Sequence, residues 1–582
     1  MAVAVVVTAS CSNELDEALQ PAGNGTLQFV VGDFPMFGEG TQTRVIGTQD
    51  EGKTAWENGD QIIVTLTSQK YGEKAAALTY DGSSWSTEAS LSYLENETPS
   101  VSVFYAPCYE VTEEGSMQLR SGMQIGMTEY LSGNYEMENG IMTITFEGAI
   151  RTYSRLRMAG VANQTLTVTT TDFTPAGATS VATEPYTLTA DDKGNAYLYG
   201  IFAEGATVTV KKGDVTLKDY TFTAEKNPNG TEYNKSYALD ARPVIKLWEY
   251  NNGETVEITD VCIIYGDGDM YDISLNIVEN TTVIFDAGTS GVKLSAPITV
   301  ADGKTLTLRI EGDAEHTING GISLGNSSNV IIEGDLTKEN NKLTVTATDG
   351  NAGIGANNGV TAGDITIRNA RVDATGSSKE ATELDREASI SSAAIGTSDG
   401  SMGNILIENS IIVAEGGYYE SSSHAAAIGI GYVGSTMGNI TLKDSQITAT
   451  NNGDGLASVI GAGWNHYVFD VVGTLGDIVI TNTDLNLSMV IGITNLYGAF
   501  IGPGFINSNA YINMGKIIFT DMTQAELDEM IATWKDPNDF YEWAVYALGK
   551  EYKGSAFGGV WVSDGADGLV RIDDGNGYYN PE

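Results

Sequence analysis

The sequence is poor in basic residues. It contains 31 lysines and arginines against 76 aspartates and glutamates, which gives a formal net charge of −45 over 582 residues. Such a surface repels the phosphate backbone of nucleic acids, so nucleic acid is excluded as an expected partner. The charge is typical of a self-repelling, secreted surface, and the more specific alternative is that some of the carboxylates bind divalent cations.

Cysteine and proline are also scarce, and long apolar runs are missing. Of the three cysteines, Cys108 and Cys262 fall in segments that we assign to different domains, so we expect no disulfide between them. No apolar run reaches the roughly 18–20 residues of a membrane-spanning helix. With 12 prolines, 68 glycines and 41% hydrophobic residues, the composition indicates folded, β-rich domains, and the length requires more than one core.

Residues 352–520 contain a repeat. An Ile-Gly motif, first seen as Ile354-Gly355, is followed in every copy by a second motif that opens with glycine. These opening glycines stand at 363, 403, 438, 476 and 515, in steps of 40, 35, 38 and 39 residues. A period of this size marks a solenoid or a propeller. Each copy contains three short β-branched runs without the hairpin turns of a propeller blade, so we predict a right-handed parallel β-helix.

Similar β-branched runs begin earlier in the chain, and we place the β-helix at residues 255–520. Aliphatic residues at matching positions of successive coils are expected to form ladders inside it, with glycines at tight corners. The ends of the expected strands carry polar residues that fit turns or stacked amides, namely Asn409, Asn439, Asp444 and Asn482.

The pattern changes after residue 520. Thr523 and Glu526 have the spacing of a helix capping box, and apolar residues follow at helical spacing. We predict a helix here, a second helix at 540–548 and a hairpin near the end of the chain. We expect residues 521–582 to cap the hydrophobic end of the solenoid or, alternatively, to dock a partner.

The first 250 residues have a different character, with short alternating strands that favour β-sandwiches. Four features follow one another: the Thr43-Arg44 dipeptide, residues 56–64 (WENGDQIIV), the pair Tyr80 and Trp85, and residues 103–107 (VFYAP). Together they resemble the fimbrillin (Mfa-like) proteins of Bacteroidetes. Members of that family often carry a histidine in the region where this chain has Arg151.

The fimbrillin resemblance implies two tandem sandwiches, which we place at residues 25–150 and 151–250. Family members build pilus shafts or tips, or act as surface adhesins. In shaft subunits, cleavage after an arginine near the first strand frees a groove for a donor strand. Arg44 lies where such a cut could fall, although a solvent-exposed arginine at a strand end is the simpler interpretation.

The N-terminus resembles a bacterial lipoprotein signal. An apolar run at residues 2–7 and small residues at 8–10 precede Cys11, and acidic residues follow it. The resemblance implies cleavage before Cys11, lipidation of its thiol and display on the cell outer membrane, with residues 1–24 as signal remnant and linker. The run is short and no basic residue precedes it, which fits a start inside a longer signal or an ordinary N-terminal segment.

Insertions between the repeats indicate where a ligand would bind. They lie at residues 377–391, 415–423, 451–456 and 465–473. On a solenoid, insertions on one face often form the binding face. The aromatic and imidazole rings in and beside them are of the kind that stack on sugars: Tyr418, Tyr419, Trp464, His466 and Tyr467. A glycan or a host surface protein is therefore the expected ligand, and the alternative is that these rings only pack their own loops.

The predicted β-helix also resembles that of pectate lyases and polygalacturonases, which raises an enzymatic alternative. These enzymes need clustered carboxylates for acid–base chemistry or to hold Ca²⁺. The repeats contain six carboxylates, mostly at turn positions: Asp364, Asp373, Glu408, Asp444, Asp477 and Asp484. The histidines His316, His424 and His466 are scattered, and the Asp-rich segments 267–272 and 573–577 lack the full spacing of a calcium loop.

We therefore expect a surface-anchored, fimbrillin-like adhesin that binds a glycan or a host surface protein through its β-helix without turnover. No cofactor is expected, with Ca²⁺ as the alternative. Two other functions stay open: a polysaccharide lyase or glycoside hydrolase on the β-helix, and a pilus tip or accessory subunit that binds other pilus subunits.

Overall fold

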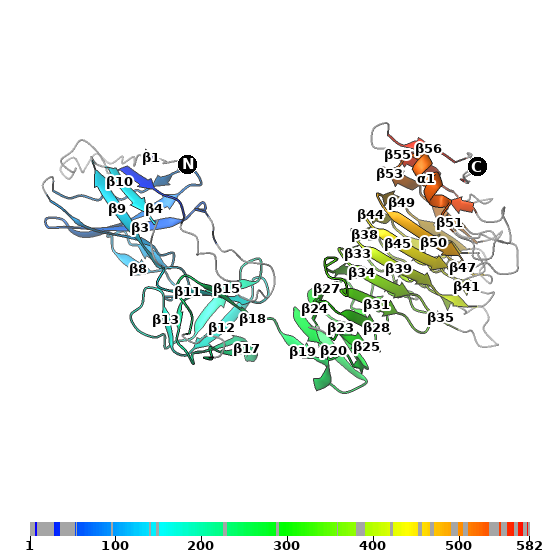
Figure 1. Ribbon diagram of the computed structural model, residues 1–582, viewed down its shortest axis with the longest axis horizontal. Helices are drawn as coiled ribbons and strands as arrows, with labels where there is room; N and C mark the ends of the chain where they lie inside the picture. The colour runs from blue at the N-terminus through cyan, green and yellow to red at the C-terminus, as the bar shows by residue number, and fades with distance from the viewer. Residues whose placement is uncertain are drawn as a thin grey trace. The chain divides into compact units, whose positions relative to one another are not determined.

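The computed structural model describes residues 6–7, 28–34, 53, 55–94, 97–138, 141–146, 151–224, 230–286, 290–357, 359–379, 390–419, 423–432, 434–451, 457–465, 471–489, 499–503, 510–534, 546–548, 556–563, 568–573 and 579. The chain divides into two compact units, Met1–Arg242 and Pro243–Glu582. Strands dominate both units, and the described residues contain a single α-helix (Figure 1). The predicted mainly β fold, with sandwich-like sheets before a parallel β-helix and a small helical cap, is confirmed.

The first part of unit 1 is an eight-stranded sheet that encloses its own core, in the order β1-β2-β10-β9-β6-β3-β4-β5. Phe29 and Ile62, from strands near its two ends, lie in that core. Trp56 packs edge-on against Trp85, and its Nε1 donates to the carbonyl oxygen of Gly32 (2.9 Å). The strands are β1 (Val6–Val7), β2 (Gln28–Val31), β3 (Gln61–Ser68), β4 (Gly72–Tyr80), β5 (Trp85–Ser86), β6 (Ser100–Tyr105), β9 (Leu131–Glu138) and β10 (Ile141–Thr145), with a separate hairpin of β7 (Tyr109–Val111) and β8 (Met117–Leu119).

The second part of unit 1 consists of two four-stranded sheets around one core, in the orders β13-β15-β11-β18 and β14-β12-β16-β17. Side chains alternate along β15, so that Ala196 and Leu198 join this core while Tyr197 and Tyr199 lie on the opposite face. The strands are β11 (Ser154–Ala159), β12 (Thr165–Thr170), β13 (Phe173–Pro175), β14 (Tyr186–Thr189), β15 (Asn195–Phe202), β16 (Thr207–Lys212), β17 (Val215–Thr221) and β18 (Ser236–Asp240).

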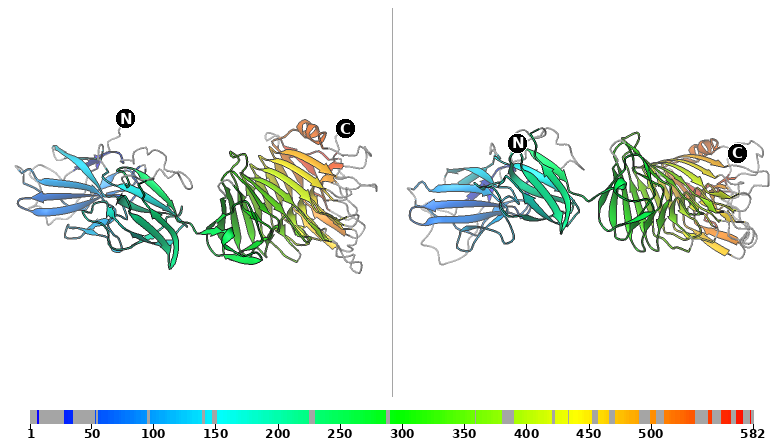
Figure 2. Two further views of the ribbon diagram at one scale, coloured as in Figure 1. Left: turned by 60° about the horizontal axis from the view of Figure 1, so that its bottom comes forward. Right: turned by 90° about the horizontal axis from the view of Figure 1, so that it is seen from below.

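Unit 2 is a parallel β-helix whose coils stack into three long sheets of 12, 10 and 8 strands (Figure 2). The first sheet contains β19 (Val244–Lys246), β21 (Cys262–Tyr265), β24 (Thr281–Asp286), β27 (Thr305–Glu311), β30 (Asn329–Glu333), β33 (Ile365–Arg368), β38 (Ile405–Glu408), β44 (Ile440–Lys443), β49 (Ile478–Thr481), β53 (Ile517–Thr520), β55 (Val560–Ser563) and β56 (Val570–Arg571). The second contains β20 (Glu254–Ile258), β23 (Ile273–Ile277), β26 (Ile298–Val300), β29 (Ile322–Leu324), β32 (Ile354–Ala356), β37 (Ile395–Thr397), β42 (Ile428–Ile430), β46 (Ile460–Ala462), β51 (Ala499–Gly502) and β54 (Tyr546–Leu548). The third contains β22 (Met270–Tyr271), β25 (Lys293–Leu294), β28 (Glu315–Ile318), β31 (Lys342–Thr346), β34 (Arg371–Thr375), β39 (Ile411–Gly416), β45 (Gln446–Asn451) and β50 (Asp484–Met489), and a short corner sheet contains β43 (Thr436–Met437), β48 (Val471–Leu475) and β52 (Ala510–Met514).

The two repeated motifs fall on different sheets. The Ile-Gly motif lies on second-sheet strands, and the motif that follows it forms first-sheet strands. Ile365, Ile405 and Ile440 are register partners on successive first-sheet strands, and each is fully buried. Burying one such side chain stabilises the fold by about 1.5–3 kcal/mol, so the predicted aliphatic ladders account for the stacking of the coils.

The glycine of the Ile-Gly motif lies inside a strand and not at a corner, where we expected the glycines. These glycines, which share φ values between +134° and +152°, are Gly355, Gly396, Gly429, Gly461 and Gly502. They stack in register, and a Cβ built on Gly396 would lie 1.8 Å from the carbonyl oxygen of Gly429. The motif therefore requires glycine both for its backbone angle and for the close approach of the next coil.

A ladder of Asn and Asp side chains ties the coils together where the first-sheet strands begin. Oδ1 of Asp364 accepts the backbone N–H of Asn404 (2.6 Å), and Oδ1 of Asn404 accepts that of Asn439 (2.9 Å). Oδ1 of Asn439 and of Asp477 repeat the contact on the following coils, the last with Lys516. These repeated polar residues therefore satisfy backbone donors between coils.

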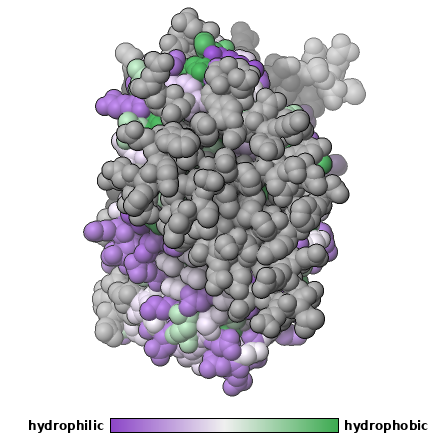
Figure 3. Space-filling view, turned by 90° about the vertical axis from the view of Figure 1, so that its right-hand side faces the viewer, coloured by the Kyte–Doolittle hydropathy of each residue, from purple (hydrophilic) through white to green (hydrophobic). Residues whose placement is uncertain are grey.

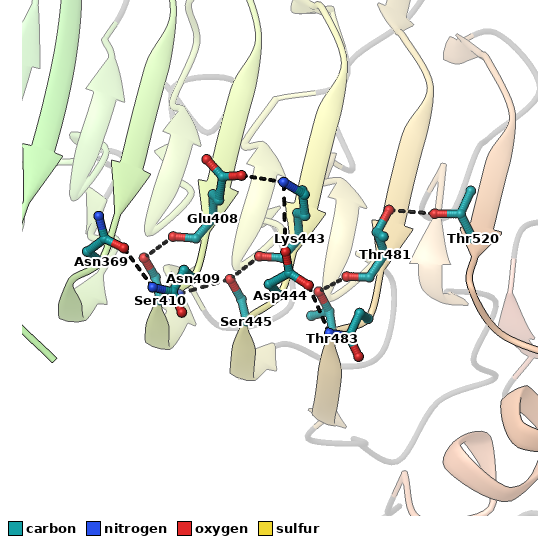
Figure 4. Close-up of polar contacts among 11 residues, drawn as sticks. Asn369, Glu408, Asn409, Ser410, Lys443, Asp444, Ser445, Thr481, Thr483 and Thr520 are labelled. Carbon is teal, nitrogen blue, oxygen red and sulfur yellow. Dashed lines mark hydrogen bonds and ion pairs between the residues drawn. The ribbon is translucent and has the colours of Figure 1, made fainter. Parts of the chain in front are cut away.

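A second polar ladder lies at the corner where the same strands end (Figure 4). Asn369, Asn409, Asp444 and Asn482 have left-handed backbones, with φ between +43° and +53°. Nδ2 of Asn409 donates to Oδ1 of Asn369 (2.6 Å), and Nδ2 of Asn482 donates to Oδ1 of Asp444 (2.8 Å). The prediction of stacked amides is confirmed for Asn409, whereas Asn482 donates to a carboxylate.

The predicted helix after residue 520 is α1 (Gln524–Ile531), which packs on the last coils. Oγ1 of Thr523 accepts the N–H of Glu526, and the Glu526 carboxylate accepts the N–H of Thr523, so the capping box is confirmed. Trp534 follows the helix, lies in the solenoid core and donates its Nε1–H to the carbonyl oxygen of Leu485 (3.1 Å).

The second predicted helix is wrong at residues 546–548, which form β54 and pair in parallel with β51. Residues 540–545 lie outside the described chain. Local apolar spacing favoured a helix, but the unpaired backbone groups at the end of the second sheet offer hydrogen-bond partners that a helix cannot use. β55 likewise continues the first sheet in parallel, and the predicted terminal hairpin is confirmed as β55 and β56.

Candidate functional site

Three of the insertions form short strands outside the main coils of the β-helix. The first two are hairpins, β35 (Ser378–Lys379) with β36 (Ile390–Ser391) and β40 (Tyr418–Tyr419) with β41 (Ser423–His424), and the third contributes β47 (Trp464–Asn465). β41 pairs in antiparallel fashion with both β40 and β47, and the hairpin of β35 and β36 lies beside β40 and β41. Insertions from different coils thus combine into one surface.

The backbone register of this small sheet aligns three ring-bearing residues. Tyr418 lies opposite His424, and His424 lies opposite Trp464. We call these three positions the aromatic row. Neighbouring positions across antiparallel strands are roughly 4.5–5.5 Å apart, which is the spacing needed to contact one extended ligand.

The bases of the hairpins are closely packed against the coils. The N–H of Gly417 donates to the carbonyl oxygen of Ser392 (2.9 Å), and the N–H of Ala425 donates to that of Gly417 (3.2 Å). Nδ2 of Asn451 donates to the carbonyl oxygen of Ala457 (2.7 Å). Because Ser392, Ala425, Asn451 and Ala457 are fully buried, the hairpins emerge from a well-packed base.

Figure 3 faces the side of the solenoid on which β41 and β47 lie, and the coloured residues along its lower edge are mostly hydrophilic. Of the predicted ligand-binding residues, Tyr418, Tyr419 and Trp464 lie on the three-stranded sheet. His466 and Tyr467 lie outside the described residues, as do Cys11 and Arg44.

His424 is the position that we did not predict as a site residue. It joins the aromatic row only through the pairing of β41 with both neighbours. Its segment has no Asn-Gly or Asp-Gly turn signal, and the partner strand β47 is 40 residues away from it along the chain. The aromatic residues in the same insertions are the sequence signal that could have pointed to His424.

Most of the carboxylates considered for catalysis make contacts between coils. Asp364 and Asp477 belong to the ladder that accepts backbone N–H groups. The Glu408 carboxylate accepts from Nζ of Lys443 (2.5 Å), as Figure 4 shows, and the Asp373 carboxylate lies 3.1 Å from Nζ of Lys342. Each of these acids therefore has a structural partner on a neighbouring coil.

The described ranges contain no group of three or more His, Cys, Asp or Glu side chains placed to hold a metal ion. In the Asp-rich segment 267–272, the Asp267 carboxylate accepts the N–H of Asp269 (3.1 Å) and the hydroxyl of Tyr271 (2.9 Å). Asp573 accepts the N–H of Val560 (2.7 Å). In these contacts the carboxylates act as turn and strand-end acceptors. Within the same ranges, no helix is long and apolar enough to cross a membrane.

His316 lies in the core of the solenoid, away from solvent. Its side chain is fully buried on β28, and its Nδ1 accepts the N–H of Val292 (3.1 Å). Burial lowers the pKa of His316 from 6.5 to about 4, because the charged imidazolium loses its hydration there. This histidine therefore stays neutral at physiological pH and has no access to a substrate.

The buried histidine makes the stability of the solenoid depend on pH. Between pH 6.5 and about 4, the unfolded chain binds a proton at His316 that the folded chain does not. His316 therefore makes its full contribution to the free energy of unfolding above pH 6.5. This contribution, roughly 3 kcal/mol, is lost as the pH falls from 6.5 to about 4. Urea midpoints between pH 4.5 and 6.5 measure this dependence.

The matched variant is His316→Asn, which retains an acceptor for the Val292 N–H but does not titrate. Its urea midpoint is expected to depend less on pH than that of the wild type over the same range. Because the carboxylates contribute equally to both proteins, the difference between the two slopes isolates His316. Equal slopes would contradict the assignment.

A scan against models of known protein families finds no match to this chain, and a search of curated proteins finds no similar sequence. One similar solved structure is from Bacteroides fragilis and is described as a "putative cell adhesion protein". It is 11% identical, with a TM-score of 0.20, and the match covers 38% of this chain and 90% of that one. A likeness at this level assigns neither a family nor an activity.

Proposed function

We propose that this chain is a surface-anchored, fimbrillin-like adhesin that binds a glycan or a protein of another cell through the hairpin surface of its β-helix, without chemical turnover. The observation that carries the proposal is the aromatic row. Two insertions, which interrupt a regular solenoid at different coils, pair with each other and align Tyr418, His424 and Trp464, and a third insertion forms a hairpin beside them. Rigid aromatic residues on a well-packed base provide contact area at low entropic cost, and sugars and proteins are both recognised this way.

The adhesin would be held at the outer membrane through lipidation of Cys11. The apolar run and small residues before Cys11 support this part of the proposal. Metabolic labelling with palmitate tests it, since label is expected on the wild type and not on Cys11→Ala. Label retained by the variant would remove the anchor from the proposal.

Binding is tested with the full chain on a glycan array, followed by affinity measurements on the glycans that bind. Trp464→Ala and Tyr418→Ala are each expected to weaken binding about tenfold or more, as central aromatic contacts do. Trp248→Ala is the matched control, because Trp248 is an exposed tryptophan (47%) on the short helix Leu247–Glu249 at the other end of the solenoid. Loss of binding in the control alone would contradict the proposed surface.

Two other outcomes would replace this function. Release of unsaturated, ultraviolet-absorbing products from an acidic polysaccharide, with or without Ca²⁺, would favour a lyase on the β-helix. Polymer formation after cleavage at Arg44 by an arginine-specific protease would favour a pilus subunit.

A further inference from the structure

Unit 1 contains a cavity that the proposed adhesin function does not use. Its volume is about 530 Å³, and it lies where the two sandwiches of this unit meet. Tyr105 of β6 and residues 122–123 and 127–129 line it from the first sandwich. Thr187 and Thr189 of β14 with Tyr197 and Tyr199 of β15 line it from the second. The volume is within the range of small-ligand sites.

The walls of the cavity are held in place by hydrogen bonds between the two sandwiches. The N–H of Tyr199 donates to the carbonyl oxygen of Gly126 (2.7 Å), and the hydroxyl of Tyr186 donates to that of Ile125 (3.0 Å). Beside the cavity, Glu129 accepts from Nε of Arg151 (2.7 Å). The cavity is therefore a preformed feature of unit 1 and needs no rearrangement to admit a ligand.

The Tyr105 hydroxyl is the feature of the cavity that points to a ligand. The side chain of Tyr105 is 4% exposed, and among the described residues no group hydrogen-bonds its hydroxyl. Burial, together with the charges of Asp60 and Glu129, raises the pKa of Tyr105 far above its usual value, so the group remains a neutral hydroxyl. Tyr105 lines the cavity, where a ligand can supply its hydroxyl with a hydrogen-bond partner.

The charges around the cavity are already compensated by the protein. Nζ of Lys53 lies 2.5 Å from Oδ1 of Asp60, and Glu129 is paired with Arg151. The Asp191 carboxylate accepts the N–H groups of Lys193 and Asn195 in a turn. Among the lining residues that the structure describes, these contacts leave no free cationic group to bind an anion, so a phosphate or a carboxylate ligand is disfavoured.

The remaining lining combines tyrosine rings with hydroxyl groups. Tyr197 and Tyr199 lie on one face of β15, with ring centroids 6.3 Å apart and planes inclined by 32°. Thr187 and Thr189 add exposed hydroxyls on β14. Aromatic faces complement the C–H faces of a sugar ring, and hydroxyl groups complement its hydroxyls.

We propose that this cavity binds a neutral saccharide of one or two rings, with the Tyr105 hydroxyl as a hydrogen-bonding partner. The site is separate from the hairpin surface of the β-helix and does not depend on the adhesin function. It gives unit 1 a ligand of its own.

Isothermal titration calorimetry of the full chain with glucose, galactose, maltose and lactose tests the proposal, with glucuronic acid as the charged control. At least one neutral sugar is expected to bind, and glucuronic acid is expected to bind at least tenfold more weakly. Tyr105→Phe, which removes one oxygen atom and keeps the ring, is expected to weaken binding about fivefold. Tyr197→Ala, which removes a ring from the wall, is expected to weaken it about tenfold.

Two control variants test whether the bound sugar lies in this cavity. Tyr80→Phe removes a tyrosine hydroxyl from the same sandwich outside the cavity and is expected to leave the affinity unchanged, as is Trp248→Ala on the β-helix. Absence of binding by all four sugars, or equal affinity for wild type and both cavity variants, would overturn the proposal. Loss of binding in Trp464→Ala would move the sugar site to the β-helix and overturn it as well.

Discussion

Replacing Gly429 by alanine is expected to destabilise the solenoid more than replacing a glycine of the solenoid whose Cβ position is open. The new Cβ would lie 2.0 Å from the carbonyl oxygen of Gly461, and the φ of Gly429 is +134°. Backbone strain costs about 1–3 kcal/mol and forced overpacking adds about 1–3 kcal/mol. We therefore expect the free energy of unfolding to fall by roughly 4 kcal/mol, measured as a lower urea midpoint by circular dichroism.

The control for this substitution is Gly303→Ala. Gly303 also has a positive φ (+70°), but no atom lies within 4 Å of a Cβ built on it. Only the backbone cost of about 1 kcal/mol is expected there. Because stacked coils can unfold in steps, the comparison rests on midpoints of the two variants. Similar midpoints would show that the distance between coils is not what requires glycine.

Glu129→Gln is expected to cause the largest loss of stability in unit 1. The Glu129 carboxylate accepts from Nε of Arg151 (2.7 Å) and from the hydroxyl of Tyr153 (3.0 Å), and all three side chains are buried. Removing the negative charge takes the Glu129 counter-charge away from the Arg151 guanidinium in a desolvated place. Breaking a buried pair costs about 3–5 kcal/mol, which thermal unfolding would detect as a lower midpoint for this unit.

Two further variants decide whether this effect is electrostatic. Glu110→Gln breaks an exposed pair with Arg120 (3.9 Å) in the same unit and is expected to change stability by less than about 1 kcal/mol. The double variant Glu129→Gln, Arg151→Met removes both charges and is expected to recover part of the loss. If the double variant is no more stable than Glu129→Gln, the loss comes from packing and not from the unpaired charge.

Much of the β-helix was predictable because each coil uses the same residues. The isoleucines at 365, 405 and 440 recur at the period of one coil, and in a parallel stack a period in sequence becomes a ladder in space. The capping box at Thr523 was predictable for a similar reason, since its two hydrogen bonds join residues three apart. In the β-helix the determining contact repeats from coil to coil, and in the capping box it joins residues close in sequence.

Other features could not be read from local patterns. The helix expected at 540–548 has helical spacing, yet residues 546–548 complete the edge of the second sheet. The glycines of the Ile-Gly motif recur visibly in the sequence. Glycine is required there because a carbonyl oxygen of the next coil, more than 30 residues away, lies too close for a Cβ. Arg151, which stood out only by its difference from the fimbrillin pattern, has its buried partner in the other sandwich.

The sequence by itself therefore determined the mainly β architecture, the stacking of coils and the insertions that interrupt them, because these depend on repeated residues and short-range contacts. The tertiary structure decided which residues meet. The pairing of β41 with β40 and β47 created the aromatic row, and the meeting of two sandwiches placed Tyr105 in the lining of a cavity. Both arrangements depend on contacts between distant segments, whose geometry is set by packing and hydrogen bonding across the fold and not by the period of any one stretch.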